Sequence, residues 1–179
     1  MIFMARHGET DHNRPPVRVM GHLDAPLNET GREQAAELAE RAAKEGIVAL
    51  YASPLQRAWD TAQVVGEKLG IEPVRDERLM ESYRGEWEGL LWDDIERDHP
   101  DGFAAWKAAE GFSFPGGESL REQADRVAAA LDDIRARGAF PALAVTHGGC
   151  IRVTLSMRDG GGVERFHEFD VPNGTLIPL

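Results

Sequence analysis

The stretch of sequence that decides the fold is MIFMARHGE, residues 1–9. The apolar run at residues 1–5 predicts a buried β-strand, and Arg6 and His7 follow it directly. Ligands bind at the carboxyl ends of strands in open α/β sheets. Arginine offers a rigid fork of donors for phosphate, and a neutral histidine offers a lone pair that can attack, bind a metal or accept a proton. This opening predicts a catalytic site at a sheet edge.

Length and composition point to one compact domain spanning residues 1–179, because 179 residues with 42% hydrophobic content suffice for an ordinary core. The net charge of −11 argues against duplex nucleic acid or an anionic membrane as a partner. An anionic ligand would therefore need local positive charge. No apolar stretch approaches the ~20 residues that span a bilayer, no secretion signal is seen, and the single cysteine fits a reducing compartment. We expect a cytoplasmic protein.

The rest of the chain alternates predicted strands and helices. Further buried strands are expected at 47–52 and 142–146, and helices at 30–45, 53–69, 118–137 and 150–157. Thr30 and Glu33 form a capping box for the first of these helices. Closing strands are expected at 166–171 and 175–179, joined by a tight turn at Asn173 and Gly174. This order predicts a three-layer α/β/α sandwich around a mainly parallel sheet.

Two segments break this alternation. Residues 6–28 are rich in Gly, Pro, Asn and Asp and predict a long loop, of a kind that often carries function. The section around residues 82–117 mixes aromatic residues, carboxylates and glycines. We expect it to form short helices that act as a lid.

Six residues lie where a strand gives way to a loop or where a helix begins. They are Arg6, His7, Asn13, Arg57, Glu81 and His147. A phosphate monoester carries nearly two negative charges and repels a nucleophile unless fixed cations neutralise it. Arg6, Arg57 and a protonated His147 would supply these cations. The neutral ring of His7 could then attack phosphorus and form a phosphohistidine, provided that its other nitrogen donates to a carbonyl.

The leaving alkoxide needs a proton, and Glu81 is our candidate for the general acid. Spacing alone does not separate Glu81 from Glu77, Glu86 and Glu88. A bound dianion would raise the pKa of this acid, which could afterwards activate water as a base. Asn13 could equally be a turn residue.

Two other chemistries are open to a test on spacing. His7, Glu9 and His12, with His22 and Asp24 available, resemble a metal cluster, but their order is not the His-Glu-x-x-His that places two ligands one helical turn apart. Metal hydrolysis is the minor interpretation. Cys150 near His147 suggests a cysteine phosphatase, yet Ser156 stands where that chemistry needs an arginine. Cys150 is better explained by helix packing.

These residues, taken with their neighbours, resemble the histidine phosphatase superfamily, the phosphoglycerate-mutase-like group, over nearly the whole chain. The matching stretches are RHGET at 6–10 with Asn13, GHLDAPL at 21–27, SPLQRA at 53–58, Glu81 with GEWEG at 85–89, PGGES at 115–119 and THGG at 146–149. Together and in this order they are highly specific.

The resemblance implies a three-layer α/β sandwich with His7 as the phosphorylated nucleophile and Glu81 as the proton donor. It implies that Arg6, Asn13, Arg57 and His147, with the adjacent Gly148, bind the phosphoryl group. It also implies that neither a metal nor an organic cofactor is needed. The expected activity is that of a histidine acid phosphatase-type phosphoric monoester hydrolase.

Family resemblance does not separate a phosphatase from a mutase. Similar mutases carry a longer insertion with extra basic residues, whereas cations in residues 82–117 are few and carboxylates many. We therefore expect a cofactor-independent phosphomonoesterase acting on a small soluble monophosphate with a neutral or ring-bearing leaving group. Phosphoglycerate mutase is the alternative, and a phosphate-dependent binding module is a third. The expected partner is this small molecule, with no nucleic acid or membrane, and a homodimer is left open.

Overall fold

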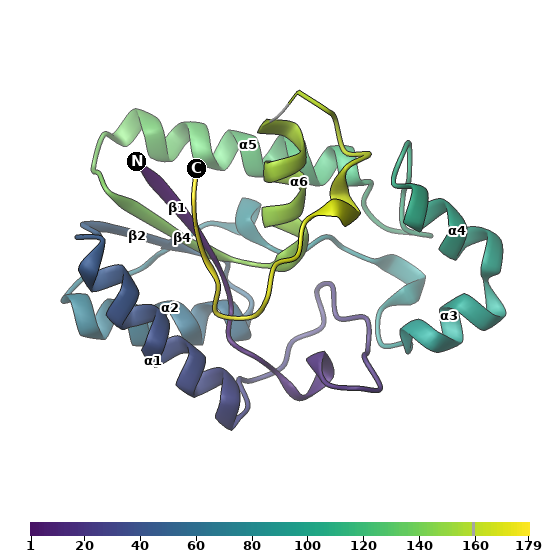
Figure 1. Cartoon of the computed structure of the whole chain (residues 1–179), viewed down its shortest axis with the longest axis horizontal. Coiled ribbons are helices and arrows are strands. Elements are labelled where there is room, and N and C mark those ends of the chain that lie inside the picture. The colour runs from purple at the N-terminus through teal and green to yellow at the C-terminus, as the bar shows by residue number, and fades with distance from the viewer. Residues whose placement is uncertain (159) are drawn as a thin grey trace.

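A central five-stranded sheet organises the computed structural model, which describes residues 1–158 and 160–179 (Figure 1). The strands are β1 (Ile2–Arg6), β2 (Ala49–Ala52), β3 (Val74–Arg75), β4 (Ala142–Thr146) and β5 (Leu176–Pro178), in the order β3-β2-β4-β1-β5. Four strands run parallel, and β5 pairs antiparallel with β1. The sheet is therefore mainly parallel, as predicted.

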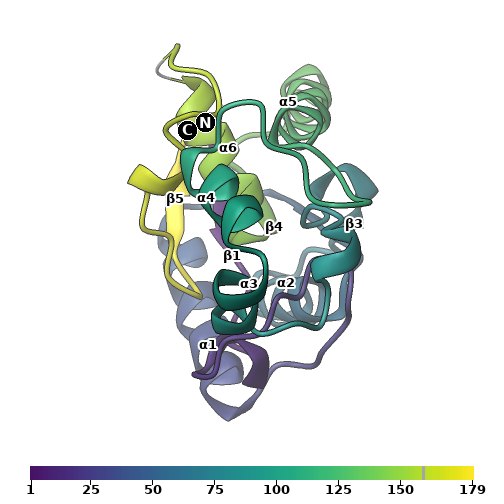
Figure 2. The same ribbon diagram turned by 90° about the vertical axis from the view of Figure 1, so that its right-hand side faces the viewer.

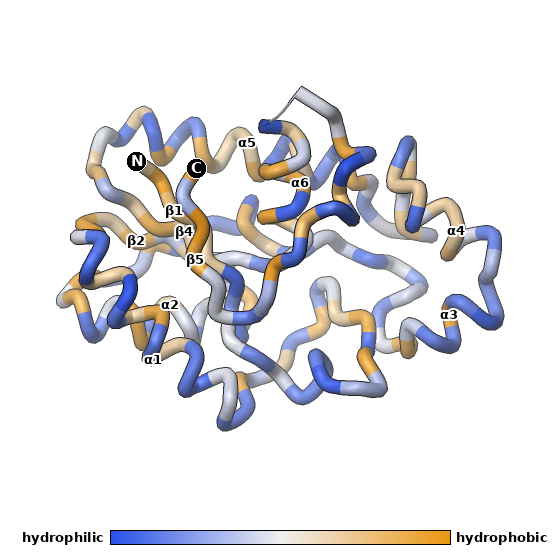
Figure 3. Tube along the Cα trace, in the orientation of Figure 1, coloured by the Kyte–Doolittle hydropathy of each residue, from blue (hydrophilic) through white to orange (hydrophobic). Residues whose placement is uncertain are grey.

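Helices cover both faces of this sheet (Figure 1). Helices α1 (Glu29–Lys44) and α2 (Gln56–Leu69) lie on one face, and α5 (Leu120–Arg137) and α6 (Gly148–Arg158) lie on the other. Side chains of β1 alternate between the two cores, with Phe3 and Ala5 toward α1 and α2, and Ile2 and Met4 toward α5 and α6. Figure 3 shows the resulting hydrophobic colour along β1 and β4. The three-layer sandwich is confirmed.

The N-cap of helix α1 lies two residues before the position predicted from the sequence. Its N-cap is Asn28, whose Oδ1 accepts from the Gly31 amide at 2.8 Å. The Thr30 hydroxyl instead accepts from Arg14 Nη2 at 2.8 Å. The capping box expected at Thr30 and Glu33 is therefore wrong, because an asparagine two residues earlier offers an equally good acceptor.

The prediction of a closing hairpin from strands at 166–171 and 175–179 is also wrong. Residues 166–168 form a short 3-10 helix, Phe166–Glu168, and β5 pairs with β1 rather than with this segment. The reason is that Phe166 is buried in the core beneath the lid. The turn at Asn173 and Gly174 does form, with the Thr175 amide donating to Pro172 O at 3.2 Å, but it does not join two strands.

Residues 82–117, the segment expected to act as a lid, contain short helices. A 3-10 helix at Gly85–Trp87 is followed by α3 (Trp92–Asp98) and α4 (Pro100–Ala108). These helices lie at the end of the molecule away from the two marked termini (Figure 2 gives the end-on view). Trp87 anchors them, since it is buried against Phe112 and Phe114 at ring-centroid distances of 5.8 Å. Among the described residues, no helix has the length and apolar character needed to cross a membrane.

Candidate active site

A cavity of about 170 Å³ lies where β1 and β4 end. Five arginines line it: Arg6, Arg18, Arg57, Arg84 and Arg152. Glu81 is the one carboxylate among the described residues that line it. The net charge of the protein is −11, so positive charge is concentrated here against the overall balance. This is the local field that an anionic ligand requires.

His7 is held with one ring nitrogen free. Its main-chain amide donates to Thr146 O at 3.0 Å, and its Nδ1 donates to Gly8 O at 2.7 Å. That bond fixes the proton on Nδ1 and leaves the Nε2 lone pair available. Burial, followed by the charges of Arg57 and Arg6, lowers the pKa of His7 well below its usual 6.5. The ring is therefore neutral, and the expected carbonyl partner is present.

The loop that carries His7 is pressed against α1. A Cβ on Gly8 would overlap the carbonyl oxygen of Gly31, in the first turn of that helix. The Gly8 amide donates to Thr61 Oγ1 at 3.0 Å, and Thr61 donates in turn to Arg57 O at 2.7 Å. Two helices thus fix the main chain beside the imidazole, and this is why glycine is required at position 8.

Arg57 comes from the first turn of α2, as predicted, and only 1% of it is exposed. Its Nη1 and Nη2 donate to Leu23 O at 2.9 Å and Gly21 O at 2.8 Å, so it fastens the long loop over the site. Burial lowers its pKa to about 10, with Glu81 opposing this shift. Arg57 therefore keeps its charge at neutral pH.

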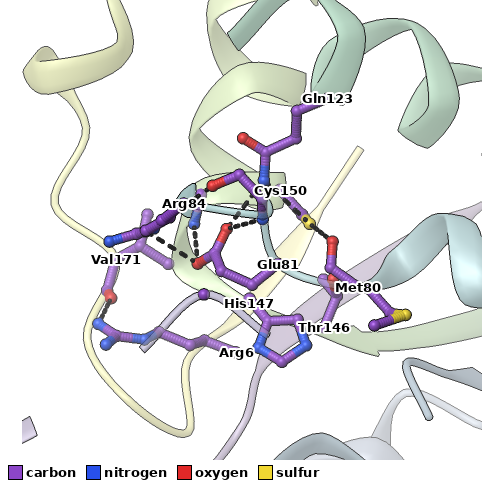
Figure 4. Close-up of polar contacts among 12 residues, drawn as sticks. Arg6, Met80, Glu81, Arg84, Gln123, Thr146, His147, Cys150 and Val171 are labelled. Carbon is purple, nitrogen blue, oxygen red and sulfur yellow. Dashed lines mark hydrogen bonds and ion pairs between the residues drawn. The ribbon is translucent and has the colours of Figure 1, made fainter. Parts of the chain in front are cut away.

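Arg6 donates through Nη1 to Val171 O at 2.6 Å (Figure 4). Its Nε is buried and hydrogen-bonds to no other described residue. Burial also lowers its pKa to about 10. Gly148 lies beside it, since an added Cβ would be 3.4 Å from that Nε. The Nε of a charged guanidinium is thus held in the site without an acceptor among the described residues.

His147 lies behind His7, with 5.1 Å between the ring centroids. It is fully buried and is not one of the described residues that line the cavity. Its Nε2 lies 2.8 Å from Ser53 Oγ, and its Nδ1 has no partner among the described residues. Burial, with the charges of Arg57 and neighbouring groups, lowers its pKa well below 6.5. The ring is therefore neutral in this structure, whereas the sequence-based expectation is a protonated His147 beside a bound phosphate.

Glu81 is surrounded by donors (Figure 4). Its Oε1 accepts from the Ser82 amide at 2.9 Å and from Gln123 Nε2 at 2.8 Å. Its Oε2 accepts from the Gly149 amide at 3.1 Å and lies 3.4 Å from Arg84 Nη2. Burial favours the neutral acid, but Arg84 and these donors outweigh burial and lower the pKa to about 2. Glu81 is therefore a carboxylate at neutral pH in this structure.

Other glutamates considered from spacing lie elsewhere. Glu77 and Glu86 are exposed, and Glu88 uses its Oε1 to accept from the amides of His22 and Arg84. Asn13 lines the cavity, and its Oδ1 accepts from the Thr10 amide at 2.9 Å, which leaves Nδ2 as a donor toward a ligand. The structure thus brings Arg6, His7, Asn13, Arg57, Glu81 and Gly148 to one cavity and places His147 behind them.

Sequence reasoning missed several residues of the site. Arg18 and Arg152 line the cavity, Gln123 holds Glu81, and Arg84 pairs with it. Two of them have a sequence feature that could have identified them. Gln123 is a polar residue in the buried stripe of α5, and Arg152 lies one turn beyond Gly148, where α6 begins earlier than the expected residue 150.

The described residues do not have the geometry that metal hydrolysis or a cysteine phosphatase would need. Within residues 1–158 and 160–179, no three His, Cys, Asp or Glu side chains gather closely enough to hold a metal ion. Glu9 instead accepts from Arg14 Nε at 2.6 Å and Asn28 Nδ2 at 2.9 Å. Cys150 is buried, donates to Met80 O at 3.0 Å, and burial raises its pKa to about 11. It stays a thiol and packs in the core, as expected.

Comparison with known proteins identifies the class to which this fold and this cationic cavity belong. Residues 2–179 match the family model of the histidine phosphatase superfamily (branch 1). The chain belongs to this family, and the resemblance seen in its motifs is confirmed.

Individual relatives carry both phosphatase and mutase names. Phosphoglycerate mutase-like protein 4 of Arabidopsis thaliana is 38% identical over 84% of this chain and 67% of its own length. Phosphoserine phosphatase 1 of Hydrogenobacter thermophilus is 34% identical over 76% and 64%. A mycobacterial glucosyl-3-phosphoglycerate phosphatase, solved in complex with VO3, is similar with a TM-score of 0.90 and 31% identity, covering 98% of this chain and 88% of its own. The chain thus spans about two thirds of these two curated relatives and most of the solved one.

Proposed function

We propose that this protein is a phosphomonoesterase that hydrolyses small phosphate monoesters through a phosphohistidine at His7. One observation carries the proposal: two buried nitrogens, Arg6 Nε and His147 Nδ1, have no acceptor among the described residues. Buried donors without partners are rare because each costs roughly 1–3 kcal/mol. With Ser53 donating to Nε2 of His147, its Nδ1 carries the proton. A phosphoryl group beside His7 would give both donors an acceptor.

The charges in the cavity support attack by His7. Arg6 and Arg57 offset the two charges of a monoester, so the neutral ring can approach phosphorus. The Nε2 lone pair forms the N–P bond while the P–O bond to the leaving group breaks, and Glu81 supplies the proton to the departing oxygen. Glu81 then takes a proton from water, whose oxygen attacks phosphorus and releases inorganic phosphate and His7.

Glu81 needs a source for its proton, because its pKa of about 2 makes it a carboxylate at neutral pH. The second pKa of a phosphate monoester is near 6, so below that pH the substrate itself brings a proton. The bound phosphate also adds negative charge next to Glu81, which raises the pKa of the carboxyl. This supports activity of the acid phosphatase type.

Hydrolysis is favoured over transfer between substrate hydroxyls. Phosphatase names are carried by the Hydrogenobacter thermophilus relative and by the mycobacterial structure that matches over most of both chains. Mutase is the second candidate because of the 38% identical Arabidopsis relative. Incubation with 3-phosphoglycerate separates the two: free phosphate indicates hydrolysis, and conversion to 2-phosphoglycerate without free phosphate indicates a mutase.

The role of Glu81 provides the test. In Glu81→Gln, hydrolysis of ethyl phosphate should fall by at least about 100-fold, whereas that of p-nitrophenyl phosphate should fall much less, because p-nitrophenolate departs without a proton. The exposed Glu86→Gln is the matched control and should change neither rate. All assays contain a chelator, and turnover should persist. Equal losses on both esters would contradict the acid role, and no turnover by the wild type would leave only a binding module.

A further inference from the structure

The arginines of the cavity exceed what a single phosphate requires. Arg6 and Arg57 offset the two charges of the phosphoryl group, and Arg84 lies 3.4 Å from the carboxylate of Glu81. Arg152 also lines the cavity, where the described residues supply no further carboxylate. A ligand with only a phosphate would leave the terminal nitrogens of Arg152 without a hydrogen-bond acceptor among the described residues.

The protein holds Arg152 with a hydrogen bond at Nε alone and leaves its two terminal nitrogens without a hydrogen-bond partner among the described residues. Its Nε donates to Phe169 O at 3.0 Å, and its guanidinium carbon lies 5.6 Å from the ring centroid of Phe166. Its Nη1 and Nη2 hydrogen-bond to no group within the described part of the chain. A guanidinium fixed through Nε and stacked on a ring presents its two terminal nitrogens as a fork that fits an oxyanion.

Arg84 faces the same space from the lid. Its guanidinium carbon lies 5.6 Å from the ring centroid of Trp92 and 5.3 Å from that of Phe114. Burial lowers the pKa of Arg152, and Arg84 is close enough to lower it further, whereas the carboxylates of Glu81 and Asp170 oppose this shift. Neighbouring cations repel each other, so an anion bound between them relieves this repulsion.

The lining of the cavity also corrects the picture of an acidic lid. Three residues of the lid reach the cavity, Arg84, Trp92 and Trp106, whereas none of its carboxylates is among the described lining residues. The lid therefore presents a cation and aromatic rings to a substrate. A leaving group with its own negative charge suits this surface better than a neutral one.

We propose that Arg152, together with Arg84, forms a second anion subsite in the cavity, which selects monoesters whose leaving group carries its own anionic group. This inference rests on the proposed phosphomonoesterase function. The phosphoryl group would lie at His7, Arg6 and Arg57, and the second anion would bind the free edge of Arg152. Both a carboxylate and a second phosphate have the required chemistry.

The first experiment compares two substrates on the wild-type enzyme. They are 4-carboxyphenyl phosphate and its methyl ester, which differ in one negative charge, with release of inorganic phosphate as the readout. We expect kcat/KM to be at least about tenfold higher for the carboxylate. A ratio near one overturns the subsite. p-Nitrophenyl phosphate in the same assay reports the proposed function alone, and its failure to turn over would overturn that function instead.

The second experiment uses variants and follows the ratio of the two kcat/KM values. In Arg152→Gln this ratio should fall to about one or two, and Arg152→Lys should retain part of the preference because it keeps the charge. Arg121→Gln is the matched control, an exposed arginine on α5 paired with Asp125, and should keep the wild-type ratio. An unchanged ratio in folded Arg152→Gln overturns the assignment. If that variant does not fold, the wild-type comparison still decides.

The third experiment separates the two sources of the second anion. 1,4-Phenylene bisphosphate replaces the carboxylate with a phosphate on the same ring. A higher kcat/KM for the bisphosphate than for the carboxylate supports a subsite for phosphate, and the reverse order supports one for carboxylate. If neither exceeds the methyl ester, the subsite is overturned.

Discussion

Strands β1 and β4 both end in a histidine followed by a glycine, yet the two histidines present opposite ring nitrogens. At the end of β1, His7 Nδ1 is bound to Gly8 O and Nε2 is free. At the end of β4, His147 Nε2 is bound to Ser53 Oγ and Nδ1 is without a partner. A loop follows the first histidine and helix α6 follows the second. The same two residues therefore give different chemistry.

The difference teaches that the neighbours of a histidine, rather than the motif, decide its role. Both rings are buried and neutral, so the two histidines do not differ in charge. His7 lines the cavity with an available lone pair, which suits a nucleophile. His147 lies behind it, and its unpaired Nδ1, which carries the proton when Ser53 donates to Nε2, suits a donor to phosphate oxygens. Each of the following predictions tests this division.

The largest effect is expected for His7→Ala. Without the ring nothing can form the N–P bond, so kcat should fall by at least about 10³-fold. Rapid acid-free quenching of the wild-type reaction with a labelled ester should trap an acid-labile adduct at His7, which the variant lacks. Thermal unfolding should confirm that the variant is folded. Retention of more than a few per cent of activity by a folded variant would refute the nucleophile.

A smaller loss is expected for His147→Ala. Removing one preorganised donor costs about 10²-fold in kcat, and the adduct at His7 should still form, only more slowly. Cys150→Ala, which alters a neighbouring buried side chain on α6, is the control and should stay within about twofold of the wild type. If His147→Ala matched the loss of His7→Ala and formed no adduct, the two histidines would not have separate roles.

A still smaller effect is expected for Ser53→Ala. This change removes the partner that fixes the proton of His147 on Nδ1, so a mixture of ring tautomers becomes populated. We expect kcat to fall about tenfold, with ¹⁵N shifts of His147 reporting the altered tautomer. Wild-type activity combined with wild-type shifts would show that Ser53 does not orient the ring.

The smallest change is expected on lowering the pH. A histidine with its pKa lowered stays neutral until the pH falls below that lowered value, so His7 and His147 should not titrate between pH 8 and pH 5 in NMR spectra. Accordingly, kcat should not show the roughly 30-fold loss at pH 5 that a nucleophile with a pKa of 6.5 would suffer. An inflection at pH 6.5 with loss of activity would contradict a buried neutral pair.

Residues at the ends of long apolar runs could be predicted from the sequence. The runs that form β1 and β4 place Arg6, His7 and His147 at one edge because parallel strands share their direction. Strand β3 has only two residues and leaves no pattern to detect. The strand expected at 166–171 does not form because Phe166 is buried in the core under the lid. This is an effect of tertiary packing, which the local alternation of apolar and polar residues does not predict.

Glu81 and the ring nitrogens illustrate a different limit. Among several nearby glutamates, only the family resemblance selected Glu81, since its position depends on donors from α5 and α6 that are remote in sequence. Arg152 was missed although the helix predicted at 150–157 contains it, because its contact with the cavity depends on how α6 packs against remote segments. Which nitrogen of a histidine is free depends on single hydrogen bonds, and no sequence pattern encodes these.

The order of the strands has a consequence for biosynthesis. β1 lies between β4 and β5, and its Ile2 pairs with Ala142. A ribosome therefore completes β1, the long loop and both helices of one face before the first neighbour of β1 exists. Until then an apolar strand has two open edges, which are sites for aggregation. In a chain of this topology β1 stays unpaired during synthesis, and the His7 pocket forms only when translation has passed β4.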